Sequence, residues 1–225
     1  FLDDASHQLR TPLTTLATQV GFALREPDPA LTKQALLAIK LQVEETVRQT
    51  NQMLSLARAD TIGWHMEPCD LEALAQEVTR AAWPAARQKQ IDLGFEPLNE
   101  SHAEVNAHAG LLKEALVNVL HNALHHTPVG AKVTVQAGIE PGDSAGEGGP
   151  QAVLRVIDNG PGMSPDELAH AGERFFRGRS QVNGSGLGLA IAKAVVERHG
   201  GGLYLQATSA DPTCPGLTVT LRWTL

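Results

Sequence analysis

The sequence predicts two domains of different class, a helical hairpin followed by a mixed α/β domain. In the first 60 residues, apolar side chains recur every three or four positions, which is the period of an amphipathic helix, and one proline-containing stretch interrupts them. Further along the chain, segments of strand composition alternate with helical segments. The length of 225 residues leaves room for two modest domains.

Composition and charge exclude several classes of protein. The chain is 42% hydrophobic and 19% charged, as expected of an ordinary soluble globular chain. Its 18 basic and 25 acidic residues give a net charge of -7, which would repel a nucleic acid. No stretch of about 20 apolar residues is present, so we expect no membrane contact in this fragment. Cys69 and Cys214 lack the CxxC spacing of a structural zinc site or a disulfide framework.

Two long helices are predicted in residues 1–60. The first runs from Leu2 to about Leu24, and the sequence Glu26-Pro27-Asp28-Pro29 ends it. The second has its apolar stripe from Leu36 to about Ala59. One partner helix cannot cover the whole apolar seam of the other, so two hairpins would bury the remainder as a four-helix bundle. A homodimer is therefore expected.

A mixed α/β domain is expected in residues 69–225, after a linker at residues 61–68. The stretch Glu140 to Pro150 is rich in glycine and proline and predicts a flexible hairpin loop. An apolar helix follows Gly188 and ends at three consecutive glycines. The other expected elements are two helices, Leu71–Gln88 and Leu111–His126, and five strands, Ile91–Glu96, Val133–Ile139, Val153–Ile157, Leu203–Gln206 and Leu217–Leu221.

His7 precedes a proline inside the first predicted helix. Pro12 has no N–H, and its ring crowds the carbonyl of Gln8 at a cost of about 3 kcal/mol, so the helix is expected to bend beside His7. His7 lies about 200° around the helix from Leu9 of the buried stripe, which points it toward solvent. An exposed neutral imidazole can act as a nucleophile or phosphate acceptor. The alternative is an ordinary surface histidine near the start of a helix.

A polar line crosses the helix predicted at Leu111–His126. Glu114, Asn118 and Asn122 are spaced four residues apart and share one face, with His121 and His125 beside them. Amide and carboxylate oxygens suit a hard cation such as Mg²⁺, although a solvated helix face has the same pattern. The two histidines lack a third ligand for zinc.

Two glycine-containing loops are present in the second domain, and the first of them follows a predicted strand. Asp158-Asn159-Gly160-Pro161-Gly162-Met163 places a carboxylate where it can accept a hydrogen bond from an exocyclic amine such as that of adenine, although the same letters also form a simple turn. The run Gly184-Ser185-Gly186-Leu187-Gly188 leads into an apolar helix, whose free N–H groups can bind phosphate. No strand directly precedes this run and no GK[ST] follows it, which excludes the Rossmann and Walker motifs.

Five motifs taken in order, HQLRTP, ExxxNxxxN, DNGPGM, RFFRG and GSGLGL, resemble those of the sensor histidine kinases of bacterial two-component systems. The resemblance covers nearly the whole chain. It implies a dimerisation and phosphotransfer hairpin followed by a GHKL-type (Bergerat) ATP-binding domain, an α/β sandwich with helices on one face of a mixed sheet. The implied activity is ATP-dependent autophosphorylation of His7 with Mg²⁺, and phosphotransfer to an aspartate of a response regulator. Phosphatase activity toward that regulator is a further expectation.

The resemblance also assigns roles to residues at matching positions. In the hairpin, His7 matches the phosphoacceptor and Thr11 the position implicated in regulator dephosphorylation. In the ATP-binding domain, Asn122 matches the Mg²⁺ ligand, with Asn118 and Glu114 in the same box, and Asp158 matches the adenine reader, with Gly160 and Gly162 shaping its pocket. The remaining matches are to the lid, namely Phe175, Phe176 and Arg177 with Arg174, and to the loop over the phosphates, namely Gly184, Gly186, Leu187 and Gly188.

Two positions depart from the family pattern. Gln8 replaces the acid that commonly follows the phosphoacceptor; an amide cannot take a proton, so we expect Gln8 to orient His7 by accepting a hydrogen bond from Nδ1–H. His125 stands where a basic residue is commoner. If His125 contacts phosphate, nucleotide affinity should weaken as the pH rises through about 6.5.

The chain begins six residues before His7, so we expect it to be the cytoplasmic portion of a membrane-anchored protein of the bacterial inner membrane. Two other functions are compatible with the motifs. A catalytically degenerate, ATP-binding dimeric signalling module is favoured only by Gln8. A GHKL ATPase of the chaperone or topoisomerase kind would lack the hairpin with its histidine before proline.

Overall fold

A computed structural model describes residues 2–59, 65–99, 102–142, 149–178, 186–209 and 215–225, and in residues 2–9 and 55–59 it describes the helical backbone alone. The chain divides into two compact units, Phe1–Ala57 and Arg58–Leu225. The first unit is helical and the second combines strands with helices.

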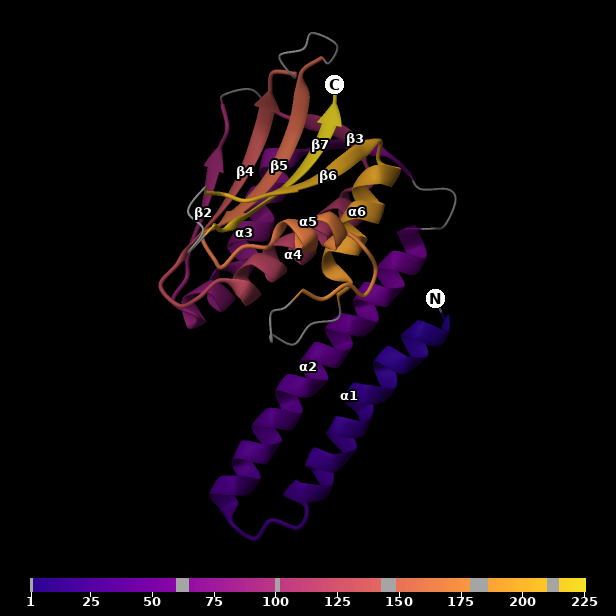
Figure 1. The fold of residues 1–225 in the computed structure, drawn as a ribbon, viewed down its shortest axis with the longest axis vertical. Helices are drawn as coiled ribbons and strands as arrows, with labels where there is room; N and C mark the ends of the chain where they lie inside the picture. Colours follow the sequence, from indigo (N-terminus) through magenta and orange to yellow (C-terminus); the bar gives the residue numbers. More distant parts are fainter. Residues whose placement is uncertain (1, 60–64, 100–101, 143–148, 179–185, 210–214) are drawn as a thin grey trace. The chain divides into compact units, whose positions relative to one another are not determined.

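The first unit is an antiparallel hairpin of α1 (Leu2–Ala23) and α2 (Pro29–Ala59) (Figure 1). The carboxylate of Asp28 accepts a hydrogen bond from the amide of Ala30 at 2.8 Å, and Pro29 occupies the first helical position. Both are preferred at a helix start. The hairpin prediction is confirmed, but α2 begins well before Leu36 because the prolines that follow α1 also start α2.

The second unit is built on a mixed five-stranded sheet of order β2-β4-β5-β7-β6. Strands β2 and β4 are parallel, with Leu93 opposite Val133, and every other neighbouring pair is antiparallel. The strands are β2 (Asp92–Pro97), β4 (Lys132–Glu140), β5 (Gln151–Asp158), β6 (Gly201–Gln206) and β7 (Leu217–Thr224).

Helices α3 (Leu71–Gln88), α4 (Ala109–His126) and α6 (Gly188–Arg198) lie on one face of this sheet (Figure 1). The core between the layers is aliphatic: Leu154 of β5 and Ile191 of α6 are fully buried. The other face is polar, since Arg155 donates to Thr220 Oγ1 at 3.2 Å across two strands. The predicted α/β sandwich with helices on one face is confirmed.

Three short elements were not predicted. Strand β1 (Glu67–Asp70) pairs with β3 (Glu104–Ala107) in a separate two-stranded sheet, and α5 (Pro165–His170) follows β5. Strand β1 begins inside the expected linker, which reached residue 68, and its last residue caps α3, because Asp70 accepts from the amides of Glu72 and Ala73 at 2.9 and 3.1 Å. Within the described ranges, no helix combines the length and the apolar character needed to cross a bilayer.

Candidate nucleotide site

Helix α4 presents the predicted polar line at the surface of the helical layer. Glu114, Asn118 and Asn122 are half-buried, whereas the opposite stripe of the helix is buried in the core. Side chains at this depth can reach a ligand and keep a fixed rotamer. The α4 backbone thus brings these three predicted residues onto one face.

Three histidines extend this face toward the end of α4. The rings of His121 and His125 stack with centroids 5.6 Å apart, and His126 meets His125 edge-on at 5.4 Å. Lys89 Nζ donates to the carbonyl of Leu124 at 3.0 Å, which places a positive charge at the C-terminus of α4, where the helix dipole favours one. Burial, assisted by Lys89, lowers the pKa of His126.

Asp158 ends β5 with its carboxylate buried. Its Oδ1 accepts from the amide of Gly160 at 2.8 Å and from the amide of Leu217 on β7 at 3.2 Å. Burial raises the pKa of Asp158, and these two hydrogen bonds oppose that rise. Neither of these two hydrogen bonds uses Oδ2, and a carboxylate oxygen can accept a further one.

The turn after Asp158 fits against its neighbours so closely that glycine is required. Gly162 has φ +68, and a Cβ there would lie 2.7 Å from the carbonyl oxygen of Gly216. A Cβ on Gly160 would lie 3.0 Å from Oδ1 of Asp158, a tight contact, and in ordinary contact, at 3.4 Å, with Cα of Thr127, the residue that ends α4. The turn therefore joins the end of α4 to the start of β7, and it places the two predicted glycines beside Asp158.

A hydroxyl pair that the sequence did not indicate holds the strand end from the β6 side. Thr208 Oγ1 donates to the carbonyl of Asp158 at 3.0 Å and lies 2.9 Å from Thr218 Oγ1. A carbonyl can only accept, so the hydroxyl of Thr208 donates to the carbonyl of Asp158. The hydroxyl of Thr218 therefore donates to Oγ1 of Thr208. No local pattern links these residues, because Thr208 lies 50 positions from Asp158.

The phenylalanine motif and the glycine loop meet at their backbones. The amide of Phe175 donates to the carbonyl of Gly186 at 2.9 Å, and Phe175 has φ +64, a conformation that side chains disfavour. Phe175 and Phe176 are half-buried, and Arg174 and Arg177 are exposed. Ahead of them, α5 starts with a capping box in which Ser164 and Glu167 bond each other's amides.

Helix α6 begins at Gly188 with no side-chain hydrogen bond capping its first turn. Leu187, which precedes it, is fully buried and anchors that end of the helix in the core. Amides at such a start can bind an anion, as the sequence suggested. Gly184 lies outside the described residues.

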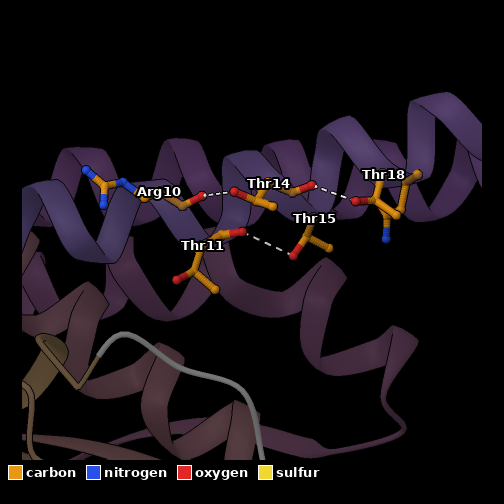
Figure 2. A pocket seen from close by; sticks show the side chains of 6 residues that line it. Arg10, Thr11, Thr14, Thr15 and Thr18 are labelled. Carbon is orange, nitrogen blue, oxygen red and sulfur yellow. Dashed lines mark hydrogen bonds between the residues drawn. The ribbon is translucent and has the colours of Figure 1, made fainter.

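The hairpin residues lie on α1, which continues through Pro12. His7 and Gln8 are part of the helix, but their side chains lie outside the described residues. Thr11 is exposed, and its carbonyl accepts from Thr15 Oγ1 at 3.1 Å. Figure 2 shows Thr11 in a pocket lined by α1 side chains, where threonine hydroxyls bond carbonyls four residues back.

The donor set suits Mg²⁺ held mainly through nucleotide phosphates. Such a site needs only one or two protein oxygens, and the predicted ligands Asn122 and Glu114 lie on one face of α4, two turns apart. In the part of the chain that the structure describes, no three or more His, Cys, Asp or Glu side chains are grouped to hold a metal. A dedicated protein cage, such as zinc requires, is therefore not found among these residues.

Comparison with known families agrees with this arrangement. Residues 107–225 match the family described as histidine kinase-, DNA gyrase B-, and HSP90-like ATPase. Residues 1–62 match the His Kinase A (phospho-acceptor) domain. The chain belongs to the first of these families and, with the phosphoacceptor domain preceding it, is a member of the two-component sensor histidine kinases. The resemblance drawn from the five motifs is confirmed.

Individual proteins similar to this chain are named as sensor proteins or histidine-protein kinases. The chain is 34% identical to the sensor protein QseC of Escherichia coli K12 over 89% of its length. It is 32% identical to the histidine-protein kinase/phosphatase MprB of Mycobacterium ulcerans over 97%. In each case it spans 42% of the relative's length. A solved structure of a mycobacterial MprB superposes with a TM-score of 0.57 at 32% identity, covering 71% of this chain and 97% of that one.

Proposed function

We propose that this chain transfers the γ-phosphoryl group of ATP to His7 and then passes it to an aspartate of a response regulator. The observation that carries the proposal is Asp158, a buried carboxylate at the end of β5 whose Oδ1 accepts from two amides. We assign the hydrogen bond from the exocyclic amine of adenine to its Oδ2. We assign residues 1–60 to the phosphoacceptor hairpin and 69–225 to the ATP-binding domain, with the linker of residues 61–68, whose last two residues belong to β1, between them.

Different residues of the ATP-binding domain bind the adenine and the phosphates of the nucleotide. Asp158 accepts the adenine amine, and Gly160 and Gly162 give the purine room beside the strand end. The amides of Gly186, Leu187 and Gly188 at the start of α6, together with Gly184, bind the phosphates. Phe175 and Arg177 belong to the lid over them.

The polar line of α4 serves the phosphates from the other side. Asn122 and Glu114 hold Mg²⁺, which neutralises phosphate charge when bound. Asn118 lies on the same line, one turn from each of them, and His125 contacts phosphate from the next turn of the helix.

The chemical step is a single displacement at the γ-phosphorus. The Nε2 lone pair of neutral His7 forms a bond to phosphorus while the bond from phosphorus to the β–γ bridging oxygen breaks, and ADP leaves with that electron pair. Gln8 accepts the Nδ1–H hydrogen bond and so fixes the tautomer that leaves Nε2 free. Bringing His7 to the nucleotide requires motion of the hairpin and the ATP-binding domain relative to each other.

The hairpin provides the surfaces on which the second protomer and the response regulator bind. Large apolar side chains are exposed along both helices, and Leu41 and Val47 of α2 are 66% and 53% exposed. Such a surface is covered when two hairpins form a four-helix bundle, so we propose a homodimer. The receiver domain of the regulator docks on the hairpin, where Thr11 serves its dephosphorylation.

The full-length protein is proposed to be an inner-membrane sensor of which this chain is the cytoplasmic portion. The support is that the chain spans only 42% of the length of its relatives.

Incubation of the chain with γ-labelled ATP and Mg²⁺ tests the proposal. Label that is acid-labile, alkali-stable and lost in a His7→Asn variant is the expected result. Release of free phosphate without labelled protein would indicate an ATPase instead. Bound ATP with neither product would indicate the degenerate signalling module, the alternative that Gln8 favours.

A further inference from the structure

A buried histidine outside the nucleotide motifs connects the two helices that carry them. His199 follows α6 and is 8% exposed. Its Nε2 lies 3.0 Å from the backbone nitrogen of His108, the residue that precedes α4, and its Nδ1 lies 2.6 Å from the carbonyl oxygen of Val195. The end of α6 is thereby bonded to the start of α4 across 91 positions of sequence.

The partners fix the tautomer of His199. The backbone amide of His108 can only donate, so Nε2 accepts and carries no proton; the carbonyl of Val195 can only accept, so Nδ1 carries the proton. Burial lowers the pKa of His199 and so favours the neutral ring; the hydrogen bond to Val195 opposes this shift, and His108 and Arg198 add to it. The neutral Nδ1–H form therefore satisfies both bonds at once.

His108 passes the constraint on to α4. Its own Nδ1 accepts from the amide of Leu111 at 3.3 Å and caps the first turn. A Cβ on Gly110 would lie 3.2 Å from the His108 ring, so glycine at this position avoids a tight contact with the ring. His199 thus binds the backbone amide of His108, and the side chain of His108 caps the first turn of α4.

The buried residues of α4 and of α6 are all aliphatic. Leu112 and Ala115 of α4 and Ala192 and Val196 of α6 are fully buried. Such side chains contribute buried area but little directional preference, so they permit small slides along the helix axes, whereas a buried hydrogen bond specifies one register. A binding site tolerates displacements of only about 0.5 Å.

We infer that His199 is a positioning residue for the nucleotide site, which through its bond to the His108 amide sets α4, with Asn118 and Asn122, against α6, with its phosphate-binding start. The inference rests on the proposed function for its consequence, whereas the bond itself is a property of the nucleotide-free protein.

Two substitutions separate the two bonds of His199. The amide oxygen of Gln reaches the place of Nε2 and keeps the bond to His108, while the amide nitrogen of Asn takes the place of Nδ1 and keeps the bond to Val195. Both variants lose one hydrogen bond, so both should lower Tm by a similar amount. His199→Asn should weaken Mg·ATP binding by about five- to tenfold, and His199→Gln by less than about twofold.

Equal losses of affinity in the two variants would make His199 merely structural and overturn the inference. Two measurements on the nucleotide-free protein test the inference independently of ATP binding. Hydrogen exchange at the amides of Leu111 and Leu112 should accelerate in the Asn variant only, and ¹⁵N spectra of the wild-type imidazole should show a protonated Nδ1. A protonated Nε2 would contradict the inference, whereas failure of the wild type to bind ATP would contradict the proposed function alone.

Discussion

Phe175 donates its amide proton to the carbonyl of Gly186 at 2.9 Å, and both residues have left-handed backbones, with φ +64 and +66. This bond fastens the phenylalanine motif to the last part of the glycine loop. A non-glycine residue in this conformation costs about 1–2 kcal/mol, so surrounding contacts must hold Phe175 in place. Strained backbone of this kind is typical of functional sites.

The first prediction concerns Gly186→Ala. A Cβ at this position would lie 2.7 Å from backbone atoms of Phe175 and Phe176, so the two segments must separate. We expect loss of ATP affinity and a fall in stability beyond the backbone cost of about 1–2 kcal/mol. Gly200→Ala is the matched control, because Gly200 has φ +74 with no atom within 4 Å of the added Cβ. Calorimetry of both variants measures the difference, and similar behaviour would refute the contact.

The second prediction concerns Asp158→Asn. The variant keeps an oxygen for the amides of Gly160 and Leu217 and replaces Oδ2 by the amide NH2 group of asparagine, which cannot accept a hydrogen bond. Loss of a hydrogen bond to a charged group, about 1.5–3 kcal/mol, should weaken ATP binding by roughly 10- to 150-fold. Burial raises the pKa of Asp158, so its ionised form is disfavoured in the folded state, and Tm should stay the same or rise slightly. A marked fall in Tm would instead assign Asp158 a structural role.

The third prediction concerns stability below neutral pH. Burial lowers the pKa of both His199 and His126 from 6.5, so the unfolded chain binds protons that the folded chain refuses. Their contribution to stability is complete above about pH 6.5 and is lost as the pH falls through that value toward the lower folded-state pKa. Glu173 raises the pKa of the exposed His170, which acts weakly in the opposite sense.

Thermal denaturation followed by circular dichroism should therefore give a lower Tm at pH 5.5 than at pH 7.5. His199→Gln, which does not titrate, should reduce this difference. An identical pH dependence in the wild type and the variant would exclude His199 as a source.

The fourth prediction concerns Gln8→Glu. A carboxylate beside His7 favours the imidazolium form and raises the pKa of His7. The acidic limb of the autophosphorylation rate should then move to higher pH, while Gln8→Ala should lower the rate without that displacement. An unchanged rate and pH profile in the Glu variant would remove any special role for Gln8.

The fifth prediction concerns dimerisation. Val47→Glu places a charge on the exposed apolar surface of α2 and should shift the chain toward monomer in sedimentation velocity. Gln34→Glu adds the same charge at an exposed polar position of α2 and should leave the dimer intact. The prediction is wrong if the two variants sediment alike.

Local patterns were sufficient for much of the fold. The 3.6-residue period gave α3 and α4, and the strand composition of Val133–Ile139 and Val153–Ile157 gave the centre of the sheet. Strands β1 and β3 escaped prediction because each has only four residues and pairs only with the other. The start of α2 was misplaced because proline both ends and begins helices.

The site divides in the same way. Asp158 was identified from the residues that follow it, but the amide of Leu217 that fixes its Oδ1 lies 59 positions away. The bonds from Thr208 to Asp158 and from His108 to His199 are equally long-range. Tertiary structure creates such contacts, and a single histidine before three glycines carries no local sign of its partner.

The division of labour between the two oxygens of Asp158 has a consequence for the choice of nucleobase. Guanine carries a carbonyl at C6 where adenine carries an amine, so in the proposed site GTP would place its carbonyl oxygen against Oδ2 of Asp158 with no proton between them. Turning the carboxylate to relieve this repulsion would break its bonds to the strand beside it. The proposed site would then favour adenine over guanine nucleotides, which competition of GTP with bound ATP would reveal.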